Sequence, residues 1–297
     1  MQANGIRLKG GERWWLWFFL APTLFGLTFG TLGPVLAAIG ISFTKWDVLT
    51  PPVFAGLGNY IQLISDPTFQ QSILNTVYYV LGTVPAATVL SLLLALLLNQ
   101  KLKGITFYRT AYFLPIVSST VAVALVWSWI YSKDFGLLNF LLRNIGVQPI
   151  GWLTSMRYAM PALIIMGIWG MLGEGMIIFL AGLQGISQTY YEAAEVDGAN
   201  TWTKFLHITL PMITPSMFFY FIITMINAFQ AFEQIYVMTR GGPNNATTTM
   251  VYYVYTNAFR NFRMGYASAQ AIALFLIVMV LTLIYWRSQE KWVVYDD

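Results

Sequence analysis

The sequence contains no cysteine and only one histidine, His207, among its 297 residues. Without cysteine the chain can form neither disulfides nor thiolate metal sites, and it has no cysteine nucleophile. A single histidine also removes the usual histidine-based metal sites and catalytic triads. We therefore expect no metal site, no catalytic residue and no cofactor in this chain, and we do not expect it to be an enzyme.

Charged residues are scarce, at 9% of the chain, whereas hydrophobic residues make up 57%. Soluble globular proteins carry about 25% charged residues, so a water-facing surface cannot be covered here. Most of the surface must instead face lipid, which is one expected partner. The aromatic content of 16% suits interfacial belts at the lipid headgroups. The net charge of +4 is small, and nucleic acid is not an expected partner.

Charge-poor apolar stretches long enough to cross a bilayer predict six transmembrane helices. Helices are favoured over barrel strands because the apolar runs are continuous rather than alternating. The expected fold class is therefore an all-α membrane protein, with the whole chain, 1–297, forming one transmembrane domain. The six expected spans cover approximately residues 14–43, 73–98, 110–131, 158–183, 212–238 and 266–286.

Six spans place both termini on one side of the membrane, and basic residues indicate which side. They are slightly more numerous on the side of the termini. The excess is concentrated beside the first three spans, at Arg7, Lys9, Arg13, Lys101, Lys103 and Arg109. Both termini, and the segment 184–211 between the fourth and fifth spans, are therefore expected to face the cytoplasm.

The segment 184–211 is polar and carries signals for two short helices. Thr189 and Glu192 fit a capping box at the start of the first helix, and Gly198 suits a left-handed cap at its end. Asn200 or Thr201 can cap the second helix. These signals alone are equally consistent with an ordinary amphipathic connector on the membrane surface.

The same segment contains the pattern E-A-A, three residues, G, nine residues, I-x-L-P. This pattern resembles the cytoplasmic coupling loop of permease subunits of bacterial ABC importers. The stretches 107–109, 180–184 and 232–243 extend the resemblance to the carbohydrate-uptake, maltose-permease-like branch. The resemblance assigns contact with the ATPase to Glu192, Ala193, Ala194, Gly198, Ile208, Leu210 and Pro211.

This resemblance implies a transmembrane subunit of an ATP-driven importer in the bacterial inner membrane, moving a mono- or oligosaccharide into the cytoplasm. The implied partners are a second homologous permease, two ATPase subunits and an extracytoplasmic solute-binding protein. A glycerol-phosphate-like solute is the alternative substrate. Because the chain has no G-x-x-x-x-G-K-[ST] phosphate loop, ATP hydrolysis is expected from a separate chain.

Polar residues inside the expected spans are candidates for a substrate path, because polar groups facing lipid are costly. Asn227, Gln230 and Glu233 recur every three residues, so a continuous helix would present them as one stripe. Their amide and carboxylate groups can bond sugar hydroxyls. Glu174 on the fourth span is a further candidate, with Trp169 nearby for stacking. Alternatively, these groups only hold helices together.

Two other classes of membrane protein make different demands on the sequence. A self-contained secondary transporter needs coupling-ion sites and usually internal repeats, which the sequence does not display. A membrane-embedded enzyme needs a catalytic cluster, which His207 alone cannot form.

Overall fold

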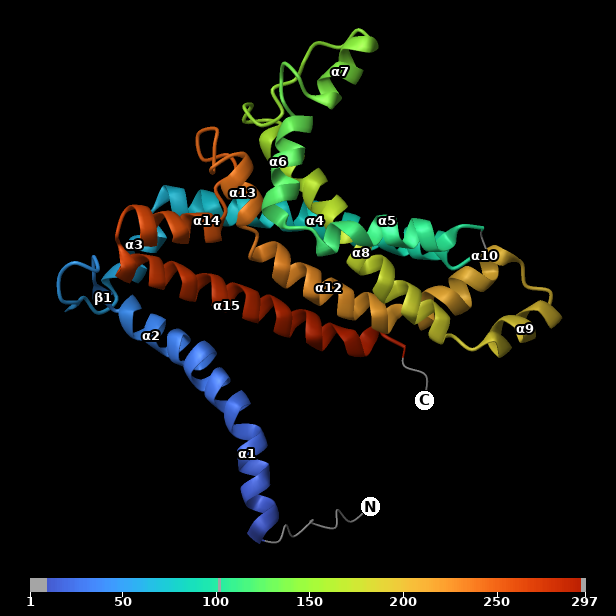
Figure 1. Ribbon diagram of the computed structural model, residues 1–297, viewed down its shortest axis with the longest axis horizontal. Helices are drawn as coiled ribbons and strands as arrows, with labels where there is room; N and C mark the ends of the chain where they lie inside the picture. The colour runs from blue at the N-terminus through green and yellow to red at the C-terminus, as the bar shows by residue number, and fades with distance from the viewer. Residues whose placement is uncertain (1–9, 101–102, 295–297) are drawn as a thin grey trace.

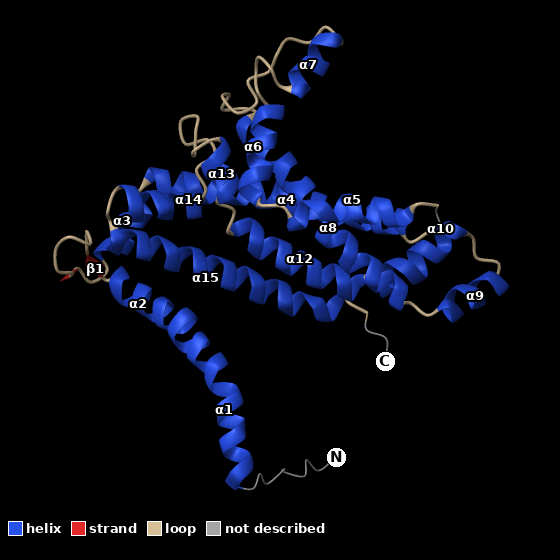
Figure 2. Ribbon diagram, viewed as in Figure 1, coloured by secondary structure: helices blue, strands red, loops and turns tan. Residues whose placement is uncertain are grey.

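The computed structural model describes residues 10–100 and 103–294, and the regular structure in these residues is almost entirely helical (Figures 1 and 2). Arg7, Lys9 and Lys101, which support the expected orientation, lie outside the described residues. Among the described helices, five are long and apolar enough to cross a membrane, or six if one bent pair forms a single span. The expected all-α membrane fold is confirmed at this level.

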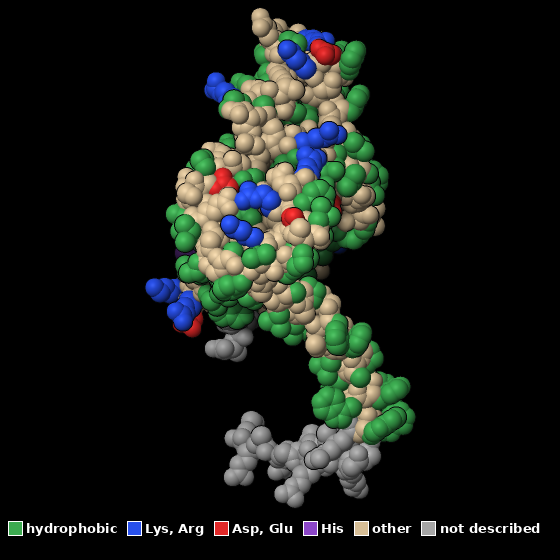
Figure 3. All heavy atoms as spheres, turned by 90° about the vertical axis from the view of Figure 1, so that its left-hand side faces the viewer, with side chains coloured by type: hydrophobic (Ala, Val, Ile, Leu, Met, Phe, Trp, Pro, Cys, Tyr) green, Lys and Arg blue, Asp and Glu red, His purple; other side chains and the backbone are tan. Residues whose placement is uncertain are grey.

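The first candidate span protrudes from the rest of the molecule. It consists of α1 (Gly10–Leu27), a π-helical turn (Thr28–Leu32) and α2 (Gly33–Ser42). Its most apolar stretch has no residue buried inside the chain, and many of its large hydrophobic side chains are exposed, as the visible face of the protruding helix shows (Figure 3). Only its α2 end lies against the bundle, beside α15 (Met264–Ser288).

Four helices running lengthwise form the bundle: α4 (Pro67–Leu98), α8 (Ala159–Gly185), α12 (Thr214–Phe229) and α15 (Figure 1). The pair α4 and α8 packs most extensively. A Cβ added at Gly175 of α8 would lie 2.5 Å from the Cβ of Ser91 on α4, so the close approach of the two helices requires glycine there. Membrane helices associate through such contacts of small residues.

The third expected span, residues 110–131, is not one continuous helix. The chain forms α5 (Ile105–Val117) beside α8, and then α6 (Thr120–Ile130), which is bent from α5 by 104°. Pro115 cannot donate a helical hydrogen bond, and the Ser118 hydroxyl donates to the Leu114 carbonyl at 2.8 Å. Proline and serine therefore end the helix where apolar composition alone predicts continuity.

The fifth expected span, residues 212–238, is also divided. Helix α12 ends at Phe229, and α13 (Glu233–Met238) begins after a break at residues 230–232. Apolar side chains of α4, α8, α12 and α13 form one core cluster that includes Tyr79, Leu163, Met225 and Ile235. The short helix α13 is thus packed against the bundle although it is separate from α12.

The two ends of the bundle carry different connecting elements (Figure 1). One end holds α9 (Gln188–Val196) and α10 (Thr201–Lys204), together with the α4–α5 connection. The opposite end holds the hairpin β1 (Thr44–Lys45) and β2 (Val53–Phe54), with α3 (Gly58–Ser65) and α14 (Met250–Tyr255). This second end displays both acidic and basic side chains (Figure 3). The remaining short elements are α7 (Leu137–Asn144), π-helical turns at Phe205–Thr209 and Thr256–Arg260, α11 (Leu210–Met212) and a 3-10 turn at Gln289–Lys291.

Asp66 joins several elements at the hairpin end. Its Oδ1 accepts backbone N–H groups of Thr68 at 2.9 Å and Phe69 at 3.3 Å, so it caps α4 just before Pro67. Its Oδ2 accepts the hydroxyls of Tyr266 and Tyr253. Burial raises the pKa of Asp66, but the hydrogen bonds from Tyr266, Tyr253 and the two amides outweigh burial and leave the pKa below its ordinary value.

Candidate functional site

A cavity of about 530 Å³ lies where the two broken spans face each other. The α5–α6 break contributes Ser118 and Thr120, and the α12–α13 break contributes Gln230 and Glu233. Irregular backbone at membrane depth is tolerated where it lines a cavity, because water or a solute can bond the freed polar groups. The two breaks therefore indicate a polar site inside the bundle.

The predicted stripe does not lie on one continuous helix. Asn227 is in the last turn of α12, Gln230 is in the break, and Glu233 is the first residue of α13. All three still line the same cavity, and all three side chains are exposed within the single chain. The structure therefore brings the three residues together by a helix break instead of by helical periodicity. Their contact with a substrate stays a prediction.

Tyr79 and Gln234 also line the cavity, and the sequence reading missed both. The Gln234 Nε2 donates to the Tyr79 hydroxyl at 3.0 Å, joining α13 to α4. Tyr79 is 0% exposed and belongs to the core, so it forms part of the cavity wall, where its hydroxyl accepts from Gln234. The polar run 118–120 inside an apolar span was an available signal for the α5–α6 break, whereas no sequence signal distinguishes Tyr79 from an interfacial tyrosine.

Glu174 is not among the residues that line this cavity, although Trp169 is. Glu174 follows Trp169 by five positions on α8, which rotates it by about 140° around the helix. The two side chains therefore point in different directions, and a part for Glu174 in a substrate path stays a prediction.

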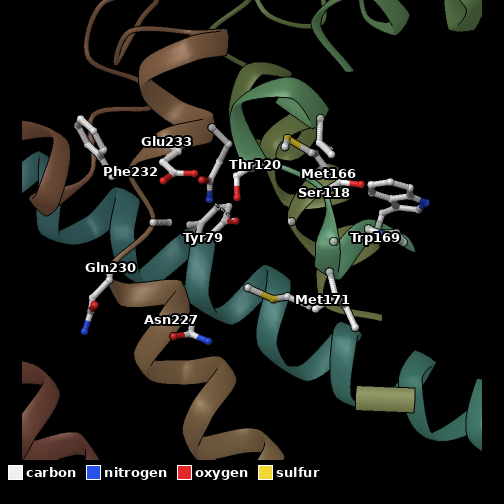
Figure 4. Close-up of a pocket in the computed structure, with 17 residues that line it drawn as sticks. Tyr79, Ser118, Thr120, Met166, Trp169, Met171, Asn227, Gln230, Phe232 and Glu233 are labelled. Atoms are coloured by element: carbon white, nitrogen blue, oxygen red, sulfur yellow. Dashed lines mark hydrogen bonds between the residues drawn. The ribbon is translucent and has the colours of Figure 1, made fainter. Parts of the chain in front are cut away.

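The chemistry of the cavity suits a neutral, hydroxyl-rich molecule. Figure 4 shows Glu233 and Trp169 on opposite sides, with Tyr79 and Thr120 between them. Amide, hydroxyl and carboxylate groups can donate to or accept from sugar hydroxyls, and an indole offers an apolar face. Among the lining residues, Glu233 carries the only formal charge.

The segment 184–211 forms two short helices, but the first begins earlier than expected. Helix α9 starts after Ser187, whose hydroxyl accepts the Thr189 N–H at 3.4 Å. The prediction that Thr189 is the N-cap, with Glu192 completing a capping box, is therefore wrong. Ser187 is an equally good N-cap and leaves Glu192 exposed in the middle of the helix.

The end of α9 confirms the expected left-handed glycine. Gly198 has φ of +77°, its N–H donates to Glu195 at 3.0 Å, and the Ala199 N–H donates to Ala194 at 2.8 Å. This paired arrangement is a Schellman motif. Asn200 then caps α10 by accepting the Thr203 N–H at 2.9 Å, as one of the two expected alternatives.

Two side-chain contacts fix α9 against the second helix. Lys204 Nζ lies 2.7 Å from Glu195 Oε1, and the hydroxyls of Tyr191 and Thr209 are 3.0 Å apart. Beyond these contacts the segment presents an exposed surface that includes apolar groups, with Val196 89% and Trp202 67% exposed. Exposed apolar side chains on an otherwise polar segment are typical of an interaction surface.

The coupling residues named by the resemblance fall into two groups. Glu192, Ala193 and Gly198 are exposed, whereas Ala194 is half-buried. Ile208, Leu210 and Pro211 are also half-buried, at the junction between the segment and α12. The first group is accessible to another protein, and the second connects the segment to the bundle.

Comparison with known proteins identifies the family. The family model described as "Binding-protein-dependent transport system inner membrane component" matches residues 53–291. A probable ABC transporter permease protein, YesP of Bacillus subtilis, is 39% identical over 284 residues, covering 94% of this chain and 91% of YesP. The lactose transport system permease protein LacF of Rhizobium radiobacter is 36% identical over 283 residues, covering 93% of this chain and 94% of LacF.

A solved structure supports the same relationship. One chain of a bacterial alginate ABC transporter, in complex with a periplasmic protein that holds an alginate pentasaccharide, matches with a TM-score of 0.83. The two chains are 25% identical, and the match covers 94% of each. The resemblance to ABC sugar-transport permeases is thereby confirmed. The chain belongs to the family of inner membrane components of binding-protein-dependent transport systems.

Proposed function

We propose that this chain is the transmembrane subunit of an ATP-driven importer that moves a carbohydrate into the cytoplasm. The cavity between the two broken spans is the observation that carries the proposal. It combines amides, hydroxyls and one carboxylate with an indole, between the two broken spans. The relatives named above, which include a lactose permease and a chain of an alginate transporter, support a carbohydrate as the substrate.

A neutral carbohydrate fits this cavity better than a glycerol-phosphate-like solute. Glu233 is the only formally charged lining residue, and a phosphate beside it would meet a like charge without a cation among the lining residues. Sugar hydroxyls can instead accept from the amides of Asn227 and Gln230 and donate to Glu233. Glu174 is a second candidate residue for the substrate path, at a position outside this cavity.

The proposed path needs a second, homologous permease. Asn227, Gln230 and Glu233 are exposed in the single chain although they lie within an expected span. Exposed polar groups facing lipid are costly, and a partner helix bundle would cover them and complete the wall of the path. The chain therefore supplies half of the translocation pathway.

The segment 184–211 is proposed to dock on a separate ATPase subunit, with two ATPases in the complete transporter. Its accessible residues Glu192, Ala193 and Gly198, beside exposed Val196 and Trp202, support this role. The chain itself needs no cofactor in this proposal, and ATP is bound and hydrolysed by the partner. An extracytoplasmic binding protein delivers the solute at the opposite end.

The proposed orientation places both termini and the segment 184–211 in the cytoplasm. Lys204 ends α10, Lys103 lies just before α5, and Arg109 in α5 donates to the Leu98 carbonyl at the end of α4. All three therefore lie at or near the end of the bundle that carries α9 and α10. Basic residues next to membrane spans favour the cytoplasmic side. The hairpin end, with α3 and α14, then faces the binding protein.

Reconstituted transport tests the proposed function. The chain, its second permease, its ATPase and its binding protein are purified together and placed in liposomes, after the binding protein has been screened against sugars by thermal shift. We expect ATP-dependent uptake of a bound sugar. ATP-independent transport of the same sugar by this chain alone would assign it to the secondary transporters instead.

Glu192→Lys tests the docking segment within the same assay. The substitution reverses the charge of an exposed residue in the middle of α9 and leaves the bundle untouched. We expect normal membrane insertion with loss of binding-protein-stimulated ATP hydrolysis. Gln100→Lys, an exposed position just after the end of α4 and outside the docking segment, is the control and should retain the stimulation. Equal stimulation in both variants would remove Glu192 from the interface.

A further inference from the structure

Four aromatic rings form a continuous series from the cavity toward the hairpin end. We call Phe232, Tyr236, Tyr255 and Phe259 the aromatic ladder. Ring centroids are 5.5 Å apart between Phe232 and Tyr236, 5.3 Å between Tyr236 and Tyr255, and 5.5 Å between Tyr255 and Phe259. Phe232 lines the cavity, on the side away from Trp169 (Figure 4). Phe259 is 61% exposed, so the ladder joins the cavity to the surface.

The ladder is partly accessible along its length, although Phe232 and Tyr236 also pack against the core cluster. Phe232, Tyr236 and Tyr255 are half-buried, whereas the neighbouring Tyr252 is buried. Tyr252 contacts Phe232 and Tyr255 from the protein side, with centroid distances of 6.4 Å to each. One side of the ladder is therefore packed against the protein, and the exposed part of each ring is available to a ligand.

A guanidinium accompanies the ladder. The Arg260 Cζ lies 5.9 Å from the ring centroids of both Tyr236 and Tyr255. Arg260 is itself exposed and offers five N–H donors, more than two tyrosine hydroxyls can accept. The ladder thus combines flat apolar faces with hydrogen-bonding groups at their edges.

This combination matches the chemistry of a pyranose ring. Such a ring has an apolar face of C–H groups, which packs on an aromatic ring, and equatorial hydroxyls at its edge, which need donors and acceptors. We propose that the aromatic ladder is an outer carbohydrate subsite, which holds a pyranose unit between its release from the binding protein and its entry into the cavity. The inference rests on the proposed function. It adds a site outside the cavity.

Sugar uptake by the complete transporter in proteoliposomes tests this subsite. The wild-type transporter is first offered lactose, maltotriose and xylotriose, and the sugar it takes up best becomes the probe. Tyr255→Leu and Phe259→Leu, which remove a ring, should each reduce uptake at low probe concentration by about fivefold. Tyr255→Phe and Phe259→Tyr, which keep the ring, should retain wild-type uptake.

Phe54→Leu is the matched control, because Phe54 is a 78% exposed aromatic residue on β2 at the same end of the bundle but outside the ladder. It should leave uptake unchanged. Uptake lowered equally by Phe54→Leu would assign the ladder to a general interfacial belt and contradict the subsite. Wild-type uptake in both leucine variants would contradict it as well.

A second measurement leaves every ladder ring in place. Asn261→Cys introduces a single thiol beside Arg260, in a chain without other cysteines. In the purified complex without binding protein, the same probe sugar should slow its reaction with a water-soluble thiol reagent. An unchanged rate would overturn the subsite. If the wild-type transporter takes up neither a probe sugar nor any sugar that its binding protein binds, both the proposed function and this inference are contradicted. Normal uptake with unaffected ladder variants contradicts the inference alone.

Discussion

Gly198 has a backbone conformation that other residues rarely adopt. Its φ of +77° ends α9 and directs the chain into α10. A Cβ at this position would meet no atom within 4 Å, so the cost of substitution is conformational rather than steric. For a residue with a side chain, the left-handed region costs about 1–2 kcal/mol. The position can therefore be changed without disturbing the bundle.

We expect Gly198→Val to uncouple ATP hydrolysis from transport, because it opposes the bend between α9 and α10. Gly104→Val is the control. Gly104 also has a positive φ, of +76°, also lacks neighbours, and lies in the α4–α5 connection at the same end of the bundle. Binding-protein-stimulated ATP hydrolysis should fall in Gly198→Val and persist in Gly104→Val. The same loss in both variants would mean that backbone strain at this end, and not the segment 184–211, is responsible.

Asp66 predicts a pH dependence of stability. The folded state lowers the pKa of Asp66, so the ionised carboxylate contributes to the free energy of unfolding. This contribution is fully present above the ordinary pKa of the group and is lost as the pH falls through the folded-state pKa. We expect the melting temperature of the purified complex to decline as the pH falls below about 4. Asp66→Asn should cost about 1 kcal/mol at neutral pH and flatten this decline, since the charged hydrogen-bond acceptor is removed. If the melting temperature of the variant declines by the same amount at low pH, other carboxylates are responsible for the decline.

At the scale of elements, the two broken spans are the features that the sequence reading did not anticipate. Apolar composition locates a span but is insensitive to its direction, so residues 110–131 read as one helix although the chain bends by 104° between α5 and α6. The signals were Pro115 and the hydroxyl run 118–120. Helical spacing predicts that one face of a continuous helix presents Asn227, Gln230 and Glu233. In the structure they line one cavity because the helix breaks between α12 and α13.

In the segment 184–211 the caps at Gly198 and Asn200 were predictable because their signals are local, whereas the N-cap of α9 was misplaced because Ser187 and Thr189 compete for it. A left-handed glycine and an asparagine N-cap act within one turn, so Gly198 and Asn200 could be placed from the sequence. Tyr79 and Gln234 meet across 155 positions of sequence, and only the packing of α13 on α4 joins them. The sequence likewise does not say which way the Glu174 side chain points, because that depends on how α8 is rotated in the bundle.

Cysteine accessibility tests the arrangement of α12 and α13. Single cysteines at positions 227, 230 and 233 should each react with a water-soluble thiol reagent, because all three side chains line the cavity and are exposed. Substrate, binding protein and ATP together should change these rates. A cysteine replacing Met225, which is buried in the core on α12, is the control and should stay unreactive. If positions 227, 230 and 233 also stay unreactive in every state, these residues hold helices together and do not line a path.

At the scale of the whole molecule, the chain has the surfaces of a subunit. The segment 184–211 exposes apolar residues at one end, the polar cavity opens on the side of the bundle, and the first span has no buried residue in its most apolar stretch. Each surface requires a neighbour or lipid, because exposed apolar groups are unfavourable in water and exposed polar groups are unfavourable in the bilayer. A heteromeric transporter accounts for the cavity and the segment together.

Purification from the native membrane tests this account most directly. The chain, tagged at one terminus and solubilised in mild detergent, should be recovered with an ATPase and with a second, homologous permease. The recovered complex should hydrolyse ATP, whereas the isolated chain should not. Gly198→Val should weaken recovery of the ATPase while leaving the second permease bound. Recovery of a stable assembly of this chain alone, competent for sugar transport without any ATPase, would contradict the account.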